Sequence, residues 1–199
     1  MVILGLNINH ADTSACIVIN GKIEFAIEEE RFTRIKHYSQ FPVNSINACL
    51  KNSNLLVKDI DFICVNYNPK ANLTAKLSYL TKNFFTIYGL KKLINFRKKL
   101  FLDTDLSKFL KENKFKGKII NVEHHLSHIA SSYLISGFDK AIALSIDGFG
   151  DFTSTASFIC EKNKIKNIKK VIFPHSLGIL YQSITQFLGF KNYGDEYKV

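Results

Sequence analysis

The sequence predicts an α/β protein in which a three-stranded unit occurs twice. In each copy, an apolar strand leads into a polar loop that carries an aspartate and a pair of hydroxyl residues, and two further strands follow around a short turn. The copies span residues 2–27 and 141–173, and their loops contain Asp12-Thr13-Ser14 and Asp151-Phe152-Thr153-Ser154. Internal similarity identifies duplicated architectures, so we expect two related subdomains. Two unrelated hairpins are the alternative.

The elements of the first half follow from local patterns. Continuous apolar runs indicate buried strands. Asn20-Gly21 predicts a type I′ hairpin, because both central positions of that turn need positive φ. Proline is favoured at the start of a helix, so Pro42 is expected to open one, and Asn68-Pro69 is expected to end a strand. The predicted strands are residues 2–8, 15–19, 22–27 and 59–67, and the predicted helix is 42–51.

The second half alternates helical and strand patterns. Residues 70–112 are predicted to be mostly helical, and Gly137 is expected to cap a histidine-rich helix. The predicted strands are residues 118–122, 141–146, 153–160 and 165–173. The predicted helices are 124–136 and 176–187, and 188–199 is predicted to be a loop.

Composition excludes several classes of protein. The chain has 199 residues, 46% hydrophobic and 22% charged, which suits one large globular domain or two small ones. Its four cysteines form no CxxC pair, which predicts reduced thiols and a cytoplasmic location. There is no apolar run of about 18 residues and no basic leader, so we expect neither a membrane span nor a signal peptide.

The formal charge of +10 is concentrated in one segment. Residues 91–118 hold ten Lys or Arg and three Asp or Glu, which supplies +7 of the total. Apolar residues within the segment keep helical spacing, so a solvated helix face explains the lysines. We therefore expect no nucleic-acid partner. A patch for another anionic partner is the alternative.

The pentapeptide His124-His125-Leu126-Ser127-His128 predicts half of a metal site. His124 and His128 are four residues apart, so on a helix both imidazoles lie on one face, about one turn apart. Imidazoles are common ligands of divalent transition metals. No glutamate follows the first histidine, so the motif lacks the general base of zinc peptidases. A histidine-rich helix start without a metal is the alternative.

Asp147-Gly148-Phe149-Gly150 directly follows an apolar strand and is expected to form a turn. Glycines there would let the backbone aim N–H groups at an oxyanion, and Asp147 at the strand end could hold a metal. With His124 and His128 it would complete an N, N, O ligand set that suits iron, zinc or manganese. We expect the three side-chain tips to lie within about 5 Å of a common point.

His10 and Asp12 lie in the loop of the first copy. An aspartate there could orient a nucleophile or a metal-bound water, and a histidine could act as acid, base or phosphate contact. Simple turn chemistry, with Asp12 in an Asx-turn, is the alternative. Three cations follow further along the chain: Arg31, Arg34 and Lys36. They could pair with phosphates or neutralise neighbouring glutamates.

A duplicated meander with phosphate-facing loops is the pattern of the actin, sugar-kinase and heat-shock ATPase superfamily, whose fold is ribonuclease H-like. In that superfamily two like subdomains clasp a nucleotide. We therefore expect a first subdomain at residues 1–139, with a basic helical insertion at about 70–116, and the start of a second at 140–199. The residues expected to contact the nucleotide are Gly148, Gly150, Asp151, Thr153 and Arg34.

Five stretches, in order along nearly the whole chain, resemble the nodulation-type O-carbamoyltransferase family. They are residues 4–12, 29–37, 124–130, 147–151 and 194–199. The resemblance implies an actin-like transferase domain joined to a second domain, which makes carbamoyl-adenylate from carbamoyl phosphate and ATP. The first domain then passes the carbamoyl group to the hydroxyl of a small molecule.

The resemblance also implies roles for particular residues. His124, His128 and Asp147 match the metal ligands of the family, and the implied metal is iron, Fe2+. His10 and Lys36 match residues near the carbamoyl and phosphate groups, so His10, Asp12 and Lys36 are the catalytic residues we expect.

The chain departs from the family at Val199, where the family continues. We therefore expect an N-terminal part that lacks a further aspartate ligand, the rest of the second subdomain and the adenylate-forming domain. Such a part is expected to be inactive alone. Two alternatives stay open, a tRNA threonylcarbamoyl transferase-like protein and a non-catalytic remnant that binds a metal or a partner. The acceptor could be a sugar, an antibiotic-like metabolite or a glycolipid.

Overall fold

The computed structural model describes residues 1–82 and 104–199. These residues divide into two compact units. Unit 1 contains residues 1–69 and 104–122, and unit 2 contains residues 70–82 and 123–199. The sequence prediction places a subdomain boundary after residue 139, and the compact units group the histidine-rich helix before that boundary with the strands after it.

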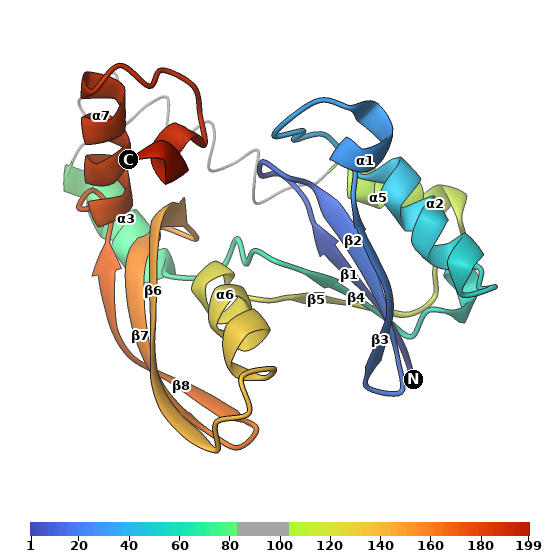
Figure 1. The fold of residues 1–199 in the computed structure, drawn as a ribbon. Coiled ribbons are helices and arrows are strands. Elements are labelled where there is room, and N and C mark those ends of the chain that lie inside the picture. Colours follow the sequence, from blue (N-terminus) through green and yellow to red (C-terminus); the bar gives the residue numbers. More distant parts are fainter. Residues whose placement is uncertain (83–103) are drawn as a thin grey trace. The chain divides into compact units, whose positions relative to one another are not determined.

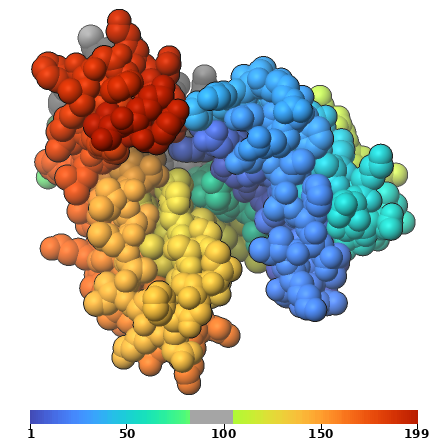
Figure 2. Space-filling model, in the orientation of Figure 1, coloured from blue at the N-terminus to red at the C-terminus, as the bar shows by residue number. Residues whose placement is uncertain are grey.

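Unit 1 is built on a mixed sheet with the strand order β3-β2-β1-β4-β5 (Figure 1). Its strands are β1 (Val2–Asn7), β2 (Ser14–Ile19), β3 (Lys22–Glu28), β4 (Phe62–Val65) and β5 (Lys118–Asn121). The first three form an antiparallel meander, whereas β4 pairs in parallel with β1, and β5 with β4. Asn20 and Gly21 have φ angles of 50° and 84°, which confirms the predicted turn. This hairpin tip is exposed (Figure 2).

Three helices of unit 1 contribute to one apolar core: α2 (Val43–Asn52), the short 3-10 helix η1 (Val57–Asp59) and α5 (Thr104–Glu112). The short helix α1 (Glu30–Thr33) follows β3 and buries no residue. α2 lies against β2 and β3 and buries Ile46 and Cys49. These side chains meet alternate strand residues such as Leu4 and Leu6, and Leu106 of α5 joins the same core. The alternation is the pattern of a sheet with one covered face.

Unit 2 is built on an antiparallel meander. Its strands are β6 (Lys140–Gly150), β7 (Thr153–Glu161) and β8 (Lys164–Ile172), in that spatial order. Its helices are α3 (Leu73–Lys82), α6 (His124–Tyr133), α7 (Leu177–Phe187) and the 3-10 helix η2 (Asp195–Lys198). α6 packs on the sheet through Ile129 and Tyr133, which meet Ala156, Phe158 and Cys160 of β7. The apolar stripe of α6 therefore fixes which helix face, and which histidines, turn toward the sheet.

Three local predictions for unit 2 are wrong. β6 continues through Gly150 with an irregular register, and the chain reverses only at Asp151 and Phe152, so residues 147–150 are not a turn. α6 ends at Tyr133, and its C-cap is Leu134, whose N–H donates to the Ala130 carbonyl oxygen, so Gly137 is not the cap. The loop prediction for residues 188–199 is wrong only at Asp195–Lys198, which form η2. The sequence also did not indicate the short helices α1 and η1 of unit 1.

The lysine-rich segment 91–118 lies partly outside the described residues. Its described part consists of α5, the following connection and β5. No helix within residues 1–82 or 104–199 has the length and apolar character needed to cross a membrane.

The two edges of the unit 2 sheet differ in their side chains. β8 carries four lysines in seven residues: Lys164, Lys166, Lys169 and Lys170. β6 instead exposes Ile142, Leu144 and Ile146, with 81%, 59% and 51% of their surface accessible within the described structure. Charged residues on an edge strand discourage pairing with other chains. The β8 edge is therefore protected by charge, and the β6 edge is apolar.

Candidate metal centre

α6 places His124 and His128 on the same side of the helix. The Glu123 side chain caps α6 by accepting a hydrogen bond from the Leu126 N–H at 3.0 Å. This cap fixes the helix to begin at His124, because a capping carboxylate satisfies an N–H group that the first turn leaves free. The two imidazoles then lie four residues apart, with their ring centroids separated by 4.6 Å.

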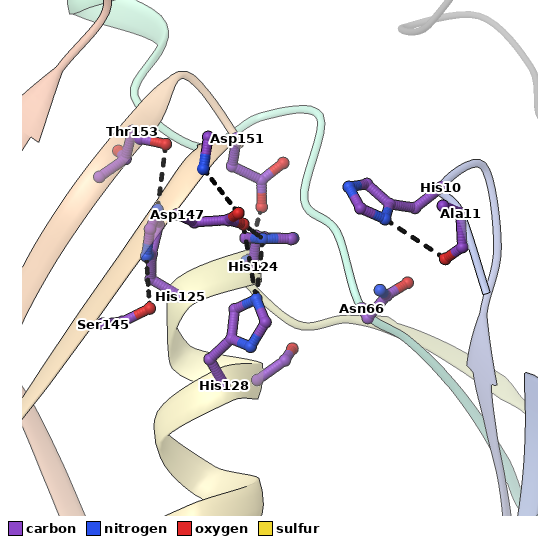
Figure 3. A network of polar contacts seen from close by, with 12 residues as sticks. His10, Ala11, Asn66, His124, His125, His128, Ser145, Asp147, Asp151 and Thr153 are labelled. Atoms are coloured by element: carbon purple, nitrogen blue, oxygen red, sulfur yellow. Dashed lines mark hydrogen bonds and ion pairs between the residues drawn. The ribbon is translucent and has the colours of Figure 1, made fainter. Parts of the chain in front are cut away.

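Asp147 of β6 reaches both histidines (Figure 3). Its Oδ2 atom lies 2.6 Å from Nε2 of His124 and 3.6 Å from Nε2 of His128, and the two Nε2 atoms are 3.0 Å apart. Three donor atoms of these residues lie within 4.8 Å of one another. The helix spacing and the position of Asp147 in the last part of β6 thus bring the three predicted side chains together at one point.

Electrostatic coupling within this group is strong. Hydrogen bonds from His124 and His128 hold the pKa of Asp147 far below its usual range, against the opposing effect of burial. In return, the bond to Asp147 raises the pKa of His128. Three basic atoms at these separations need either shared protons or a cation between them. The group is therefore suited to hold a positive charge.

His125 anchors α6 to the sheet, a role that the sequence did not indicate. The residue is fully buried. Its Nε2–H donates to the Thr153 carbonyl oxygen at 3.0 Å, so its Nδ1 is the acceptor for the Ser145 hydroxyl at 2.8 Å. Burial lowers the pKa of His125, which favours this neutral form. Only its position inside the histidine motif, on the apolar side of the helix, could have suggested the role.

Gly150 forms the surface against which the His124 ring packs. A Cβ added at Gly150 would lie 1.9 Å from the ring carbon Cδ2 of His124, a distance that no real contact allows. Gly148, two residues earlier on the same strand, differs, because an added Cβ would meet only Ile179 at 3.6 Å. A side chain at residue 150 is therefore incompatible with the observed place of His124.

We expect Gly150→Ala to lower the free energy of unfolding by about 1–3 kcal/mol, the usual effect of overpacking. Gly148→Ala is the matched control, since it adds the same methyl group where there is room, and it should change stability by less than about 0.5 kcal/mol. Urea titration of both variants measures the difference. Equal stabilities would show that His124 moves aside without cost.

The other residues predicted to contact a nucleotide mainly build this centre. The Gly148 N–H donates to the carboxylate of Asp147 at 2.6 Å, so it is not aimed at an external oxyanion. Asp151 accepts the His124 backbone N–H at 2.8 Å. Thr153 has no exposed surface, and its hydroxyl accepts a hydrogen bond from Asn72 at 3.0 Å.

α7 supports the strand end that carries Asp147. Ser176, the cap of α7, donates its hydroxyl to the carbonyl oxygens of Asp147 and Gly148, at 3.0 and 2.8 Å. A Cβ added at Gly178 would lie 2.4 Å from the Asp147 carbonyl, so this glycine permits the close approach. No local pattern indicates either contact, because both join segments about 30 residues apart.

His10 and Asp12 lie in unit 1, in the loop between β1 and β2. His10 donates from Nδ1 to the carbonyl oxygen of Ala11 at 3.3 Å (Figure 3). The Asp12 carboxylate lies 3.0 Å from Nδ1 of His37. This pair joins the first loop to the segment 34–38, which the sequence did not predict.

Arg34 and Lys36 lie on that second segment. Both are exposed, and within residues 1–82 and 104–199 neither side chain has a hydrogen-bond or ion-pair partner. Arg31 differs, because it pairs with Glu28 at 3.4 Å. Arg31 therefore neutralises a neighbouring glutamate, which was the alternative interpretation. Arg34 and Lys36 stay available to an anionic ligand.

The fold resembles that of a protein of actin-like, ribonuclease H-like fold. YeaZ from Pseudomonas aeruginosa superposes with a TM-score of 0.51 at 10% sequence identity, covering 87% of this chain and 68% of YeaZ. At that identity the likeness concerns the fold alone.

Sequence comparison identifies the relatives of the chain. It is 36% identical to the uncharacterized protein sll1178 of Synechocystis sp. over 99% of its length, and 34% identical to the nodulation protein NolNO of Sinorhizobium fredii over 94%. The matched region is 33% and 27% of these relatives, so the chain spans about a third of their length. The family model described as carbamoyltransferase N-terminus matches residues 2–199. The chain therefore belongs to the nodulation-type carbamoyltransferase family.

Proposed function

We propose that the chain is the carbamoyl-transfer part of an O-carbamoyltransferase, and that it moves a carbamoyl group from carbamoyl-adenylate to the hydroxyl of a small molecule. The observation that carries this proposal is the convergence of His124, His128 and Asp147 in a member of this family. Carbamoyl transfer needs stabilisation of charge on the carbamoyl oxygen. A cation held by these three side chains would provide it.

The donor set fits a divalent metal. Ligand bonds of about 2 Å put neighbouring ligand atoms about 3 Å apart, and the three donor separations here are 2.6, 3.0 and 3.6 Å. Two histidines and one carboxylate with open positions form the arrangement in which many proteins hold Fe2+, so iron is the metal we propose. When bound, it would polarise the carbamoyl carbonyl as a Lewis acid.

We assign the remaining chemistry to side chains of unit 1. His10 is an exposed residue of the loop between β1 and β2. It would accept the proton of the acceptor hydroxyl. Asp12 would orient that part of the site through its pair with His37. Arg34 and Lys36 would bind the phosphate of the adenylate, because both are exposed cations without a protein partner in the described structure.

The architecture we propose is a duplicated actin-like fold, in which β1–β3 and β6–β8 are equivalent meanders. The support is that each meander is antiparallel, has its first strand followed by an aspartate-containing loop or turn, and belongs to a separate compact unit.

The proposal includes a partner and a location. A separate domain would supply carbamoyl-adenylate from carbamoyl phosphate and ATP, which is consistent with relatives about three times as long as the chain. The four cysteines form no disulfide, and burial raises the pKa of the Cys49 thiol to about 11. Unreactive reduced thiols support a cytoplasmic location.

The test follows radiolabelled carbamoyl phosphate in the presence of ATP, Fe2+ and a panel of sugars and other hydroxyl acceptors. We expect no transfer by the 199-residue chain alone. Transfer should appear when the unmatched two thirds of the Synechocystis relative are added as a second polypeptide, and should be lost again with Asp147→Ala. Robust turnover by the isolated chain would contradict the proposed division of labour, and transfer to tRNA alone would favour a different enzyme class.

A further inference from the structure

A two-residue turn joins β6 to β7 at Asp151 and Phe152. Gly150 pairs with Thr153, and the residues between them have φ angles of 49° and 71°. Positive φ at both central positions is the mark of a type I′ turn. Phenylalanine rarely adopts such a backbone, because its Cβ crowds the neighbouring carbonyl, so surrounding contacts must hold it there.

Contacts from three residues outside the turn hold it in place. The amide of Asn72 donates to the Asp151 carbonyl oxygen at 2.9 Å and to the Thr153 hydroxyl at 3.0 Å. The Phe152 ring packs against Tyr79 of α3 and Phe173, with centroid separations of 5.8 and 5.3 Å. All of these residues belong to unit 2. The turn is therefore fixed by tertiary contacts and not by residues that favour its backbone.

The fixed turn aims the carboxylate of Asp151 at α6. Its Oδ2 atom accepts the backbone N–H of His124, the first residue of the helix, at 2.8 Å (Figure 3). The same strand end supplies Gly150, on which the His124 ring packs, and Asp147, which meets its Nε2 atom. His124 is thus held at its backbone, at its ring face and at its donor atom by residues 147–151.

We propose that Asp151 is a positioning residue of the metal centre, which fixes the direction of His124 through its backbone and does not itself bind a metal or a phosphate. This inference rests on the proposed function, because it assumes that His124 is a metal ligand. The reason is geometric. A metal ligand must point at the ion within a narrow range of angles, and hydrogen bonds outside the ligand shell set that direction.

Co2+ is the probe, since its visible absorption spectrum reports the geometry of its ligands. Binding to the 199-residue chain is titrated for the wild type, Asp151→Ala and Asp151→Asn. We expect Asp151→Ala to weaken binding by about 10- to 100-fold and to change the spectrum. Asp151→Asn should stay within about threefold of wild type, because its amide oxygen accepts the same N–H and asparagine tolerates positive φ.

Asp59→Ala is the matched control. Asp59 also accepts a backbone N–H, that of Leu56 at 2.9 Å, but it lies in unit 1. This variant loses an equivalent hydrogen bond away from the histidines, so it should leave affinity and spectrum unchanged. Wild-type behaviour of Asp151→Ala would overturn the inference. So would an Asp151→Asn variant as impaired as the alanine variant, since the negative charge and not the hydrogen bond would then be required.

Amide hydrogen exchange of the metal-free chain separates this inference from the proposed function. Loss of the bond to Asp151 should speed exchange of the His124 N–H by about tenfold or more, while Asp151→Asn should keep it slow. If the wild type bound no Co2+, the proposed metal site would fail, and the exchange rates would still decide whether Asp151 fixes the backbone of His124. Unchanged exchange in Asp151→Ala would refute the positioning role.

Discussion

Alanine in place of His128 should weaken Fe2+ or Co2+ binding to this chain by at least about a hundredfold. Four protein ligands bind a structural Zn2+ with about 10–16 kcal/mol, so one ligand among few is worth roughly 3 kcal/mol, which is about a hundredfold in affinity. Of the three ligand positions, His128 can be replaced with the least effect on packing, because its side chain is half exposed and its removal leaves little cavity. Anaerobic calorimetry measures the loss.

His175→Ala is the control for this experiment. His175 is an exposed histidine of the same compact unit, and it is absent from the cluster formed by the described residues. Its removal should leave the affinity within about twofold of the wild type, the scale of a surface substitution. Binding by His128→Ala that matched this control would show that the metal, if any, lies elsewhere.

The pH dependence of the same titration gives a second readout. A metal needs the neutral imidazole, so protons compete with it. The bond to Asp147 raises the pKa of His128 above its ordinary 6.5. Affinity should therefore be full at pH values above this raised pKa and fall as the pH is lowered through it, starting at a higher pH than an isolated histidine would give. A profile centred below 6.5 would contradict the coupling.

Glu29→Ala should cost about 3–4 kcal/mol of stability, the largest loss we expect from a single substitution in unit 1. The carboxylate is buried and accepts four hydrogen bonds from the start of α2: the N–H and side-chain amide of Asn44 at 3.1 and 2.7 Å, and the N–H and hydroxyl of Ser45, both at 2.7 Å. A buried donor left without an acceptor costs about 1–3 kcal/mol, and both donors of the buried Ser45 would lose theirs. Asn44 is exposed, so water can replace the carboxylate there.

Glu28→Ala provides the neighbouring control. Glu28 is exposed and only pairs with Arg31 at 3.4 Å, so its loss should change stability by less than about 1 kcal/mol. Urea unfolding, followed by circular dichroism, compares the two variants. Similar midpoints would mean that water replaces the carboxylate at the start of α2 without penalty.

The parts of the site that sequence could predict are those set by local spacing. The four-residue interval between His124 and His128 fixes a shared helix face, and the apolar run before Asp147 predicts a strand leading into it, although β6 continues past Asp147 to Gly150. Asn20-Gly21 is likewise a local signal, since both residues suit the backbone that the turn needs. These predictions required no knowledge of distant contacts.

The parts that sequence could not predict depend on contacts between distant segments. The turn at Asp151 and Phe152 uses a phenylalanine at positive φ, which only the surrounding aromatic side chains and Asn72 explain. Glu29 stands among neighbouring glutamates, and no sequence pattern predicted its burial, yet its carboxylate accepts hydrogen bonds from the start of α2. In both cases a residue with poor local agreement is held by tertiary structure.

The unequal edges of the unit 2 sheet make its growth directional. An incoming strand at β8 would meet the exposed ammonium groups of Lys164, Lys166 and Lys169, which must lose water. A strand at β6 would instead gain backbone hydrogen bonds and cover Ile142, Leu144 and Ile146. Strand addition to this sheet is therefore favoured at the β6 edge and opposed at the β8 edge. Association there would be driven by apolar contact, so added salt would strengthen it instead of screening it.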